Sequence, residues 1–220
     1  MTGVTAQVGA TLFLVRSYDD PCGVARALDA VGERWALLVV RELLLGPKRF
    51  RDLSRSLPGM SQNVLSQRLR ELEAAGVVRR RRLGPPASTS VYELTEHGAE
   101  LEAVVLALAR WGSRRPVPPA GELSVDALVL ALRTTFSAER AGDLSARVAL
   151  RLGDDGFLAR VDSGEFSIER GSGEADATLE TDASTLRSLV FLGARLDDAA
   201  VTGDRGVVER FLGCFPRPSA

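Results

Sequence analysis

Cysteine, histidine and lysine are scarce in this chain, and each shortage excludes a class of protein. The two cysteines, Cys22 and Cys214, lie far apart, no CxxC pair occurs, and His97 is the only histidine. Structural zinc sites and disulfide scaffolds need several such residues at defined spacing, so neither is expected. Two free thiols without a secretion signal are typical of a reducing compartment, and we expect a cytoplasmic protein.

Long apolar runs and aromatic residues are also few. The apolar stretch at residues 10–15 is too short to span a membrane and has no basic residue before it, so no membrane contact is expected. We interpret residues 1–17 as a flexible N-terminal extension. Aromatics make up 5% of the chain, apolar residues 45% and charged residues 26%, which indicates a globular rather than a disordered or fibrous protein.

The net charge of −1 conceals two halves of opposite sign. Residues 1–115 carry a net charge of +5 and residues 116–220 a net charge of −6, while residues 34–82 alone reach +8. A basic half favours a polyanionic partner and an acidic half disfavours one. The chain is therefore expected to contain two domains with different partners.

A proline-dense stretch separates the two halves. Pro116, Pro118 and Pro119 fall within four positions, and a helix cannot continue through them. We therefore predict a first domain over 18–115, a linker over 116–121 and a second domain over 122–220.

The first half reads as helices followed by a hairpin and a last helix. Apolar spacing predicts helices over 24–31, 34–45, 50–57, 62–75 and 95–113, and strands over 77–82 and 90–94. This order is that of a winged helix-turn-helix domain.

The predicted helix over 62–75 has two different faces. Leu65, Leu69 and Leu72 form a narrow stripe that must face the core, and Ser61 is a good N-cap. The opposite side carries polar side chains that suit base edges, because amides pair with adenine and arginine pairs with guanine. These candidates for reading the major groove of double-stranded DNA are Ser61, Asn63, Ser66, Gln67 and Arg70.

Basic residues surround this helix. Lys48, Arg49 and Arg51 precede it, and four arginines occupy positions 79 to 82 of the following strand. Strand alternation sends two of the four to each side but does not decide which pair faces outward, and we name Arg80 and Arg82 as the candidates for the DNA backbone. The alternative, a solvated helical surface with no DNA partner, stays open at this point.

The basic half resembles the HxlR-type winged-helix transcriptional regulators. The resemblance rests on the motifs Val31-Gly-Glu-Arg-Trp35, Arg41-Glu-Leu-Leu-Leu-Gly-Pro-Lys-Arg-Phe50, Pro58-Gly-Met-Ser-Gln-Asn and Tyr92-Glu-Leu-Thr-Glu-His-Gly98, in order over about residues 20–115. It implies a bacterial or archaeal regulator that binds a two-fold operator as a homodimer, joined through the first and last helices of the domain. The resemblance also assigns residues 61–70 to the major groove.

Cys22 has two interpretations. Some members of this family use a cysteine at this position as a redox sensor, and Cys22 precedes a helix, where a thiolate is stabilised. Asp19 and Asp20 oppose a thiolate, however, and a small residue at a dimer contact is the other interpretation.

The acidic half predicts an α+β domain. A helix over 123–135 is followed by four alternating runs, by a helix over 183–192 and by a helix over 207–215, which indicates an antiparallel sheet with helices on one face. The order resembles the sterol carrier protein-2-like fold, and the resemblance suggests a small hydrophobic ligand between sheet and helices. The predicted lining residues are Phe157, Phe166, Ile168, Leu179, Leu189 and Val190. A packed core or a dimer platform requires the same alternation.

Catalytic motifs are few. His97 has no second ligand or nucleophile at a motif spacing, and HExxH, GxSxG and P-loop patterns are absent, so we expect neither an enzyme nor a cofactor.

Three hypotheses remain. They are a DNA-binding regulator with a ligand-binding or dimerising C-terminal domain, an adaptor whose winged helix contacts protein, and a carrier of hydrophobic ligands.

Overall fold

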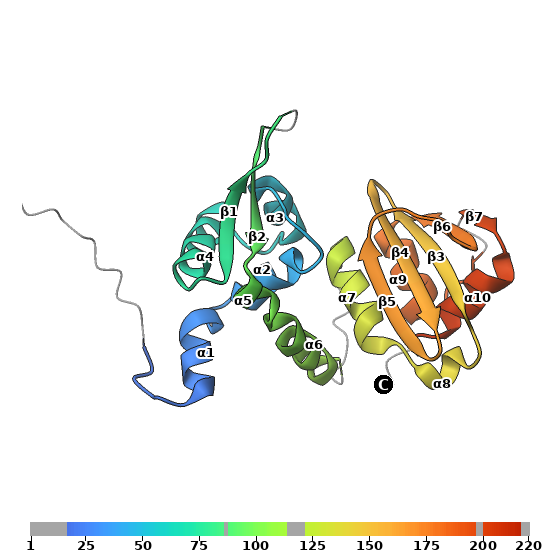
Figure 1. Ribbon diagram of the computed structural model, residues 1–220, viewed down its shortest axis with the longest axis horizontal. Coiled ribbons are helices and arrows are strands. Elements are labelled where there is room, and N and C mark those ends of the chain that lie inside the picture. The colour runs from blue at the N-terminus through green and yellow to red at the C-terminus, as the bar shows by residue number, and fades with distance from the viewer. Residues whose placement is uncertain (1–16, 86–87, 114–121, 197–199, 217–220) are drawn as a thin grey trace, which may run out of the picture.

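The structure is a computed structural model that describes residues 17–85, 88–113, 122–196 and 200–216. The predicted linker over 116–121 and almost all of the predicted N-terminal extension lie outside the described residues. Two separate apolar cores are present, one formed before residue 114 and one after residue 121. We call the two parts the N-terminal module and the C-terminal module; they lie next to each other in Figure 1.

The N-terminal module contains helices and one two-stranded hairpin (Figure 1). Its elements are α1 Gly23–Val31, α2 Ala36–Leu43, α3 Phe50–Ser56, α4 Gln62–Ala74, β1 Val78–Arg82, β2 Ser90–Leu94, α5 Glu96–Ala99 and α6 Leu101–Gly112. The predicted order of helices and strands is confirmed. The second helix starts at Ala36 rather than at residue 34, because Trp35 adopts a left-handed backbone conformation with φ of 80°.

The C-terminal module is a five-stranded sheet covered by helices on one face. Its elements are α7 Val125–Thr135, α8 Ala138–Ala141, β3 Ala146–Leu152, β4 Asp155–Asp162, β5 Glu165–Arg170, β6 Ala177–Thr181, α9 Ala183–Arg187, the π-helix η1 Ser188–Leu192, β7 Ala200–Gly203 and α10 Arg205–Gly213. Buried residues alternate along β3, so only one face of the sheet packs against helices. The short elements α8 and β7 have no counterpart in the sequence prediction.

The prediction of an antiparallel sheet is wrong for one pair of strands. The strand order is β5-β4-β3-β6-β7, and β6 runs parallel to β3 while the other pairs are antiparallel. Residues 171–176 cross the sheet to reach β6, and a Cβ at Gly173 would come within 3.1 Å of Leu158 Cδ2. Alternation along a strand reports which face is buried but not which strand is the neighbour, so the sequence did not indicate this crossing.

The interior between sheet and helices is filled by aromatic rings. Phe166 stacks on Phe136 at 5.2 Å between ring centroids and meets Phe215 edge-on at 5.3 Å, and Phe211 meets Phe215 at 5.1 Å. Phe157, Ile168 and Leu179 are at most 1% exposed within the same core. Four of the six predicted lining residues, Phe157, Phe166, Ile168 and Leu179, pack in this core.

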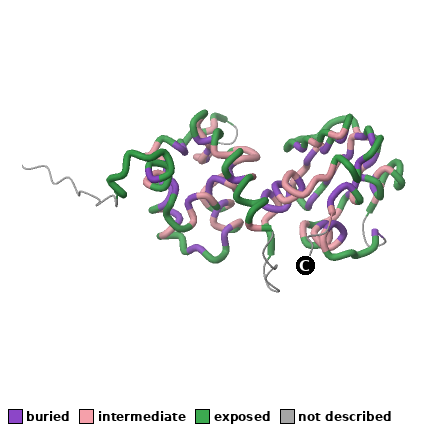
Figure 2. The backbone as a smooth tube through the Cα atoms, turned by 90° about the horizontal axis from the view of Figure 1, so that it is seen from below, coloured by how far each residue is buried: buried purple, intermediate pink, exposed green. Residues whose placement is uncertain are grey.

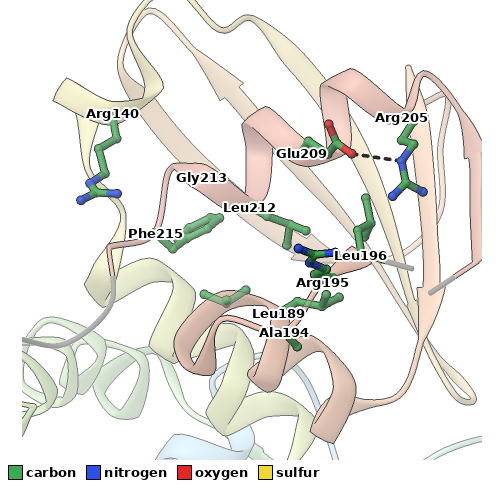
Figure 3. Close-up of a pocket in the computed structure, with 11 residues that line it drawn as sticks. Arg140, Leu189, Ala194, Arg195, Leu196, Arg205, Glu209, Leu212, Gly213 and Phe215 are labelled. Carbon is green, nitrogen blue, oxygen red and sulfur yellow. Dashed lines mark hydrogen bonds and ion pairs between the residues drawn. The ribbon is translucent and has the colours of Figure 1, made fainter. Parts of the chain in front are cut away.

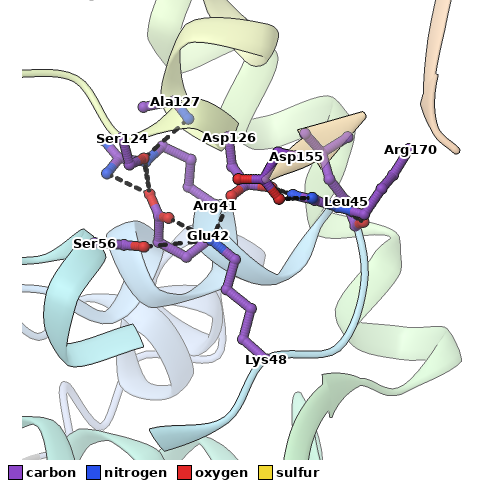
Figure 4. A network of polar contacts seen from close by, with 10 residues as sticks. All are labelled: Arg41, Glu42, Leu45, Lys48, Ser56, Ser124, Asp126, Ala127, Asp155 and Arg170. Carbon is purple, nitrogen blue, oxygen red and sulfur yellow. Dashed lines mark hydrogen bonds and ion pairs between the residues drawn. The ribbon is translucent and has the colours of Figure 1, made fainter. Parts of the chain in front are cut away.

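A buried network of polar side chains joins the two modules (Figure 4). Glu42, on α2, is fully buried and accepts hydrogen bonds from Arg41 Nη2 at 2.7 Å, Lys48 Nζ at 2.9 Å and Ser124 Oγ at 2.7 Å. Lys48 also pairs with Asp126, which lies in the first turn of α7. The contacts between Glu42 and Ser124 and between Lys48 and Asp126 therefore connect α2 to the start of α7.

The network continues into the sheet through Arg170. Its Nη2 donates to Asp126 Oδ1 at 2.7 Å, its Nη1 pairs with Asp155, and its Nε donates to the carbonyl oxygen of Leu45 at 3.3 Å. Burial opposes the charge of Arg170, but Asp126 and Asp155 outweigh this effect and raise its pKa. We call the set Arg41, Glu42, Lys48, Ser124, Asp126, Asp155 and Arg170 the inter-module network.

The inter-module network contains one of the predicted DNA-contacting residues. The only lysine of the chain, Lys48, has a side chain only 13% exposed and lies between two carboxylates of the network. Its ammonium pairs with Glu42 and Asp126 inside the contact between the modules. The sequence indicated a basic residue near α4 but not the acid that approaches it from 78 residues away.

Figure 2 shows where burial concentrates in the chain. Buried backbone lies inside each module and along the contact between them, and α1 is mostly exposed. No helix among the described residues is long and apolar enough to span a membrane.

Candidate nucleic-acid interface

Helix α4 forms as the sequence predicts because its ends and its buried face are well defined. The Ser61 side chain caps it by accepting from Val64 N at 3.4 Å, and Gly76, with φ of 70°, follows its C-terminal end. Leu65, Leu69 and Leu72 are at most 1% exposed, which confirms the predicted core stripe. Packing of this stripe fixes the rotation of α4 about its axis.

The same rotation presents the predicted base-reading side chains to solvent. Asn63, Gln67 and Arg70 are exposed, and Ser66 is half-buried at the edge of the face. Gln67 Nε2 donates to Glu71 Oε1 at 3.0 Å, a bond that is local to the helix surface. The polar face of α4 is therefore open to a partner.

One arginine of α4 does not belong to this face. Arg68 is 7% exposed, its Nη1 pairs with Glu71, and its Nη2 lies 3.6 Å from Glu33 Oε2. This side chain ties α4 to the segment between α1 and α2. It therefore positions the helix and is not available to a ligand.

The hairpin β1–β2 projects from the module beside α4 (Figure 1). Arg79 and Arg81 both donate to Glu93, at 2.8 and 2.9 Å, on one side of the hairpin. Arg80 and Arg82 are exposed on the other side, the side of the buried Val78, and no carboxylate partner is present for them among the described residues. The alternation thus separates a pair of arginines that share one carboxylate from a pair without a carboxylate partner among the described residues.

The basic residues before α4 differ in availability. Arg51 projects into solvent with 70% of its side chain exposed, although Asp52 lies 3.5 Å away. Arg49 is half-buried where α3 begins. With Lys48 withdrawn into the inter-module network, Arg49 and Arg51 remain as candidate phosphate contacts on this element.

The C-terminal module does not cover this surface. Figure 1 places α4 on the side of the N-terminal module opposite to the sheet, while α2 and α6 face α7. The contact between modules is reinforced by Arg133, which pairs with Glu102 of α6 and donates to the carbonyl oxygen of Ile168 at 2.6 Å. A partner can approach α4 and the hairpin without displacing the C-terminal module.

Two helices of the N-terminal module expose large apolar side chains. Val24 and Leu28 on α1 are 69% and 42% exposed, and Val104, Leu108 and Trp111 on α6 are 51%, 47% and 61% exposed. We call these five side chains the apolar surface.

The two cysteines lie in different environments. Cys22 is exposed at the start of α1, and its backbone N–H donates to Asp20 Oδ1 at 2.9 Å. Cys214 is buried in the C-terminal core, and burial raises the pKa of its thiol. Only Cys22 is accessible to an oxidant in solution.

The remaining chemical candidates do not gather into a site. His97 is exposed, and its Nδ1 lies 3.1 Å from Glu100 Oε2 on the next helical turn. No group of three or more His, Cys, Asp or Glu side chains suited to a metal ion occurs in the described part of the chain.

Comparisons with known proteins identify the family to which the N-terminal module is similar. The model of the HxlR-like helix-turn-helix family matches residues 30–117. The HTH-type transcriptional regulator YodB of Bacillus subtilis is 36% identical over 88 residues, which are 40% of this chain and 79% of YodB. The chain belongs to the HxlR-like helix-turn-helix family.

Further similarities cover a limited part of the chain. An uncharacterized HTH-type transcriptional regulator of Mycobacterium tuberculosis is 41% identical over 98 residues, which are 44% of this chain and 61% of that protein. The solved structure of reduced YodB from B. subtilis is 34% identical and covers 45% of this chain and 98% of its own, with a TM-score of 0.39. The family match ends at residue 117, so the C-terminal module lies outside it.

Proposed function

We propose that this protein is a sequence-specific DNA-binding transcriptional regulator that reads the major groove with α4. The observation that carries the proposal is the exposed polar face of α4, with Asn63, Gln67 and Arg70 held outward by the buried leucines on its opposite side. Membership of a family whose relatives are HTH-type transcriptional regulators supports it.

The DNA backbone is contacted in this proposal by Arg49, Arg51, Arg80 and Arg82, and Ser61 lies at the end of α4 where a phosphate is favoured. The charge of +8 over residues 34–82 supports a polyanionic partner.

The experiment is a measurement of duplex affinity against salt concentration, using an operator selected from random DNA. Wild-type affinity is expected to fall steeply as salt rises, because counterions leave the phosphates. Gln67→Ala or Arg70→Ala is expected to relax sequence preference by about 1–3 kcal/mol for each lost base contact. Arg80→Ala is expected to weaken binding to all sequences alike.

Arg160→Ala is the matched control, because Arg160 is an exposed arginine on β4, far from α4 in the chain. Unchanged duplex binding in the Gln67, Arg70 and Arg80 variants would show that α4 and the hairpin do not bind DNA. The protein would then belong to the adaptor class, in which the winged helix contacts protein.

The protein is further proposed to act as a homodimer formed through the apolar surface on α1 and α6. Isolated apolar side chains are ordinary on protein surfaces, but a group of them on two helices is typical of an interaction site. A two-fold dimer would present two α4 helices to a two-fold operator.

A redox role for Cys22 stays a prediction beside its alternative, a small residue near the dimer contact. Exposure of the thiol before α1 is compatible with both. The two are separated by treating wild type and Cys22→Ser with peroxide or a quinone and measuring operator binding. If Cys22 is a redox sensor, the treatment weakens operator binding by the wild-type protein but not by Cys22→Ser. Equal loss of operator binding in both proteins would exclude the sensor role.

The C-terminal module is proposed to be a sterol carrier protein-2-like domain with an effector-binding or dimerising role. A mixed sheet covered on one face by α7, α9 and α10 supports the fold assignment. The inter-module network supports an effector-binding or dimerising role. It holds this module in a fixed position against α2 and the turn before α3, so that a change in one module can affect the other.

A further inference from the structure

A cavity of about 480 Å³ opens in the C-terminal module, with Phe215 of the aromatic cluster in its wall (Figure 3). Its apolar wall comes from the buried Leu189 and Val190 of η1, the buried Phe215, and the half-buried Leu212 of α10. This volume lies in the range of small-molecule sites. Of the six lining residues predicted from the sequence, Leu189 and Val190 are the two found here.

The remainder of the lining is rich in arginine. Figure 3 shows the guanidinium of Arg195 between Leu212 and Leu196, with Arg140 at one end of the cavity and Arg205 at the other. Arg205 Nε donates to Glu209 Oε1 at 3.0 Å, so the charge of Arg205 compensates that of Glu209, the carboxylate of the lining. The other two arginines give the cavity a positive charge.

Arg140 and Arg195 have no carboxylate partner among the described residues. The same holds for Arg160 and Arg187, whereas the other described arginines of this module, such as Arg147, Arg151 and Arg210, lie within 4.0 Å of a carboxylate. Arg140 and Arg195 differ from Arg160 and Arg187 because both line the same cavity. Two guanidinium groups without a described carboxylate partner at one cavity favour an anion that comes from outside the chain.

Local backbone geometry places Arg195 at this position. Helix α9 continues as the π-helix η1, which ends at Gly193 with φ of 77°, a left-handed conformation that favours glycine. The chain reverses there and carries Arg195 over the wall built by Leu189 and Val190. Single π-turns within helices occur frequently at functional sites.

We propose that this cavity binds a small organic anion, a carboxylate on a compact apolar body. Arg195 holds the carboxylate, Arg140 adds charge at the rim, and the apolar body packs on Leu189, Leu212 and Phe215. The proposal deepens the effector-binding role proposed above by naming the position and the chemistry of the site. It replaces the purely apolar ligand suggested by the sequence.

The test is calorimetric titration of the purified full-length protein, without DNA, with 2-naphthoate and with the neutral 2-naphthalenemethanol. We expect 2-naphthoate to bind and the alcohol to bind at least about tenfold more weakly, because a charge-assisted hydrogen bond is lost. Arg195→Gln is expected to weaken 2-naphthoate binding at least about tenfold and to leave the alcohol unchanged. Arg160→Gln, an exposed arginine of β4 outside the cavity, is expected to change neither affinity.

A second variant tests the cavity without touching a charge. A Cβ added at Gly213, which lines the cavity from α10, meets no atom within 4 Å, so Gly213→Leu is expected to fold and to narrow the cavity. It is expected to abolish 2-naphthoate binding, with Gly213→Ala close to wild type. Circular dichroism and the melting temperature establish that each variant is folded.

Three outcomes overturn the proposal. They are no binding of 2-naphthoate up to its solubility limit, equal affinity for acid and alcohol, and equal weakening by Arg195→Gln and Arg160→Gln. Because DNA is absent from the titration, these outcomes leave the proposed DNA reading by α4 intact. Conversely, a failure of operator binding leaves the cavity result standing.

Discussion

The two modules differ in what they leave at the surface. The N-terminal module buries one stripe of α4 and exposes apolar side chains on α1 and α6, together with the charged arginines of the hairpin. The C-terminal module packs phenylalanine rings in its interior and pairs several of its arginines internally. Unpartnered apolar and basic side chains are therefore a feature of the first module's surface, and this difference is what the proposed DNA and dimer contacts depend on.

The modules are nevertheless joined by charges that are buried on both sides of the contact. Asp126 is 2% exposed and holds Lys48 from one module and Arg170 from the other. Flexibly tethered domains usually share smaller and more solvated contacts. The network therefore indicates that the position of the C-terminal module is part of the fold.

The largest expected effect follows from breaking this junction. Asp126→Ala removes the acid that Lys48 and Arg170 share, while Lys48 keeps Glu42 and Arg170 keeps Asp155. We expect a loss of about 2–3 kcal/mol in the free energy of unfolding, measured by urea denaturation. The control is Glu180→Ala, which removes an exposed partner of Arg151 at 3.5 Å and should cost less than about 1 kcal/mol. Similar losses in the two variants would mean that the junction is solvated and the modules are independent.

The second prediction compares equally exposed apolar residues of the two modules. Trp111 and Leu192 are both 61% exposed, but only Trp111 belongs to the apolar surface. Trp111→Glu is expected to raise the dissociation constant of the proposed dimer roughly a hundredfold, because an aromatic side chain that the dimer would bury is replaced by a charge. Sedimentation equilibrium measures this constant.

Leu192→Glu is the matched control and is expected to leave the dimer unchanged. A dimer that dissociates only in the Leu192 variant would place the subunit contact on the C-terminal module instead.

The smallest expected effect concerns helix caps. Asp182 caps α9 by accepting from Thr185 N at 2.8 Å, whereas the hydroxyl of Ser61 caps α4. The hydrogen bond from the Thr185 backbone lowers the pKa of Asp182 from its usual value. A lowered folded-state pKa stabilises the protein above the unfolded value, and this contribution disappears as the pH falls through the folded value.

Asp182→Ala is therefore expected to cost about 1 kcal/mol at pH 7, with the difference from wild type shrinking as the pH falls below about 4. Ser61→Ala should cost a similar amount with no such pH dependence, because a hydroxyl does not titrate in this range. Urea denaturation between pH 7 and about pH 3 measures both. A constant cost for Asp182→Ala across that range would exclude the carboxylate as the source of the cap energy.

Periodicity and capping signals were sufficient to predict the N-terminal module. The stripe of Leu65, Leu69 and Leu72, the Ser61 cap and the stop at Gly76 are local features, so they specify α4 and its outward face without knowledge of the fold. The same signals predicted the strands of the hairpin. They did not predict the exposure of Trp111. The sequence pattern of an apolar helix face is the same whether the same chain or a second chain covers that face.

By itself the sequence determined the local elements, the two opposite charges and the polar face of α4, since each depends on residues a few positions apart. Tertiary structure alone decided the parallel pairing of β6, the withdrawal of Lys48 and the cavity beside Arg195. Each of these depends on residues brought together from distant positions, such as Lys48 and Asp126. Helical and strand periodicity carries no information about which distant residue arrives opposite a given side chain.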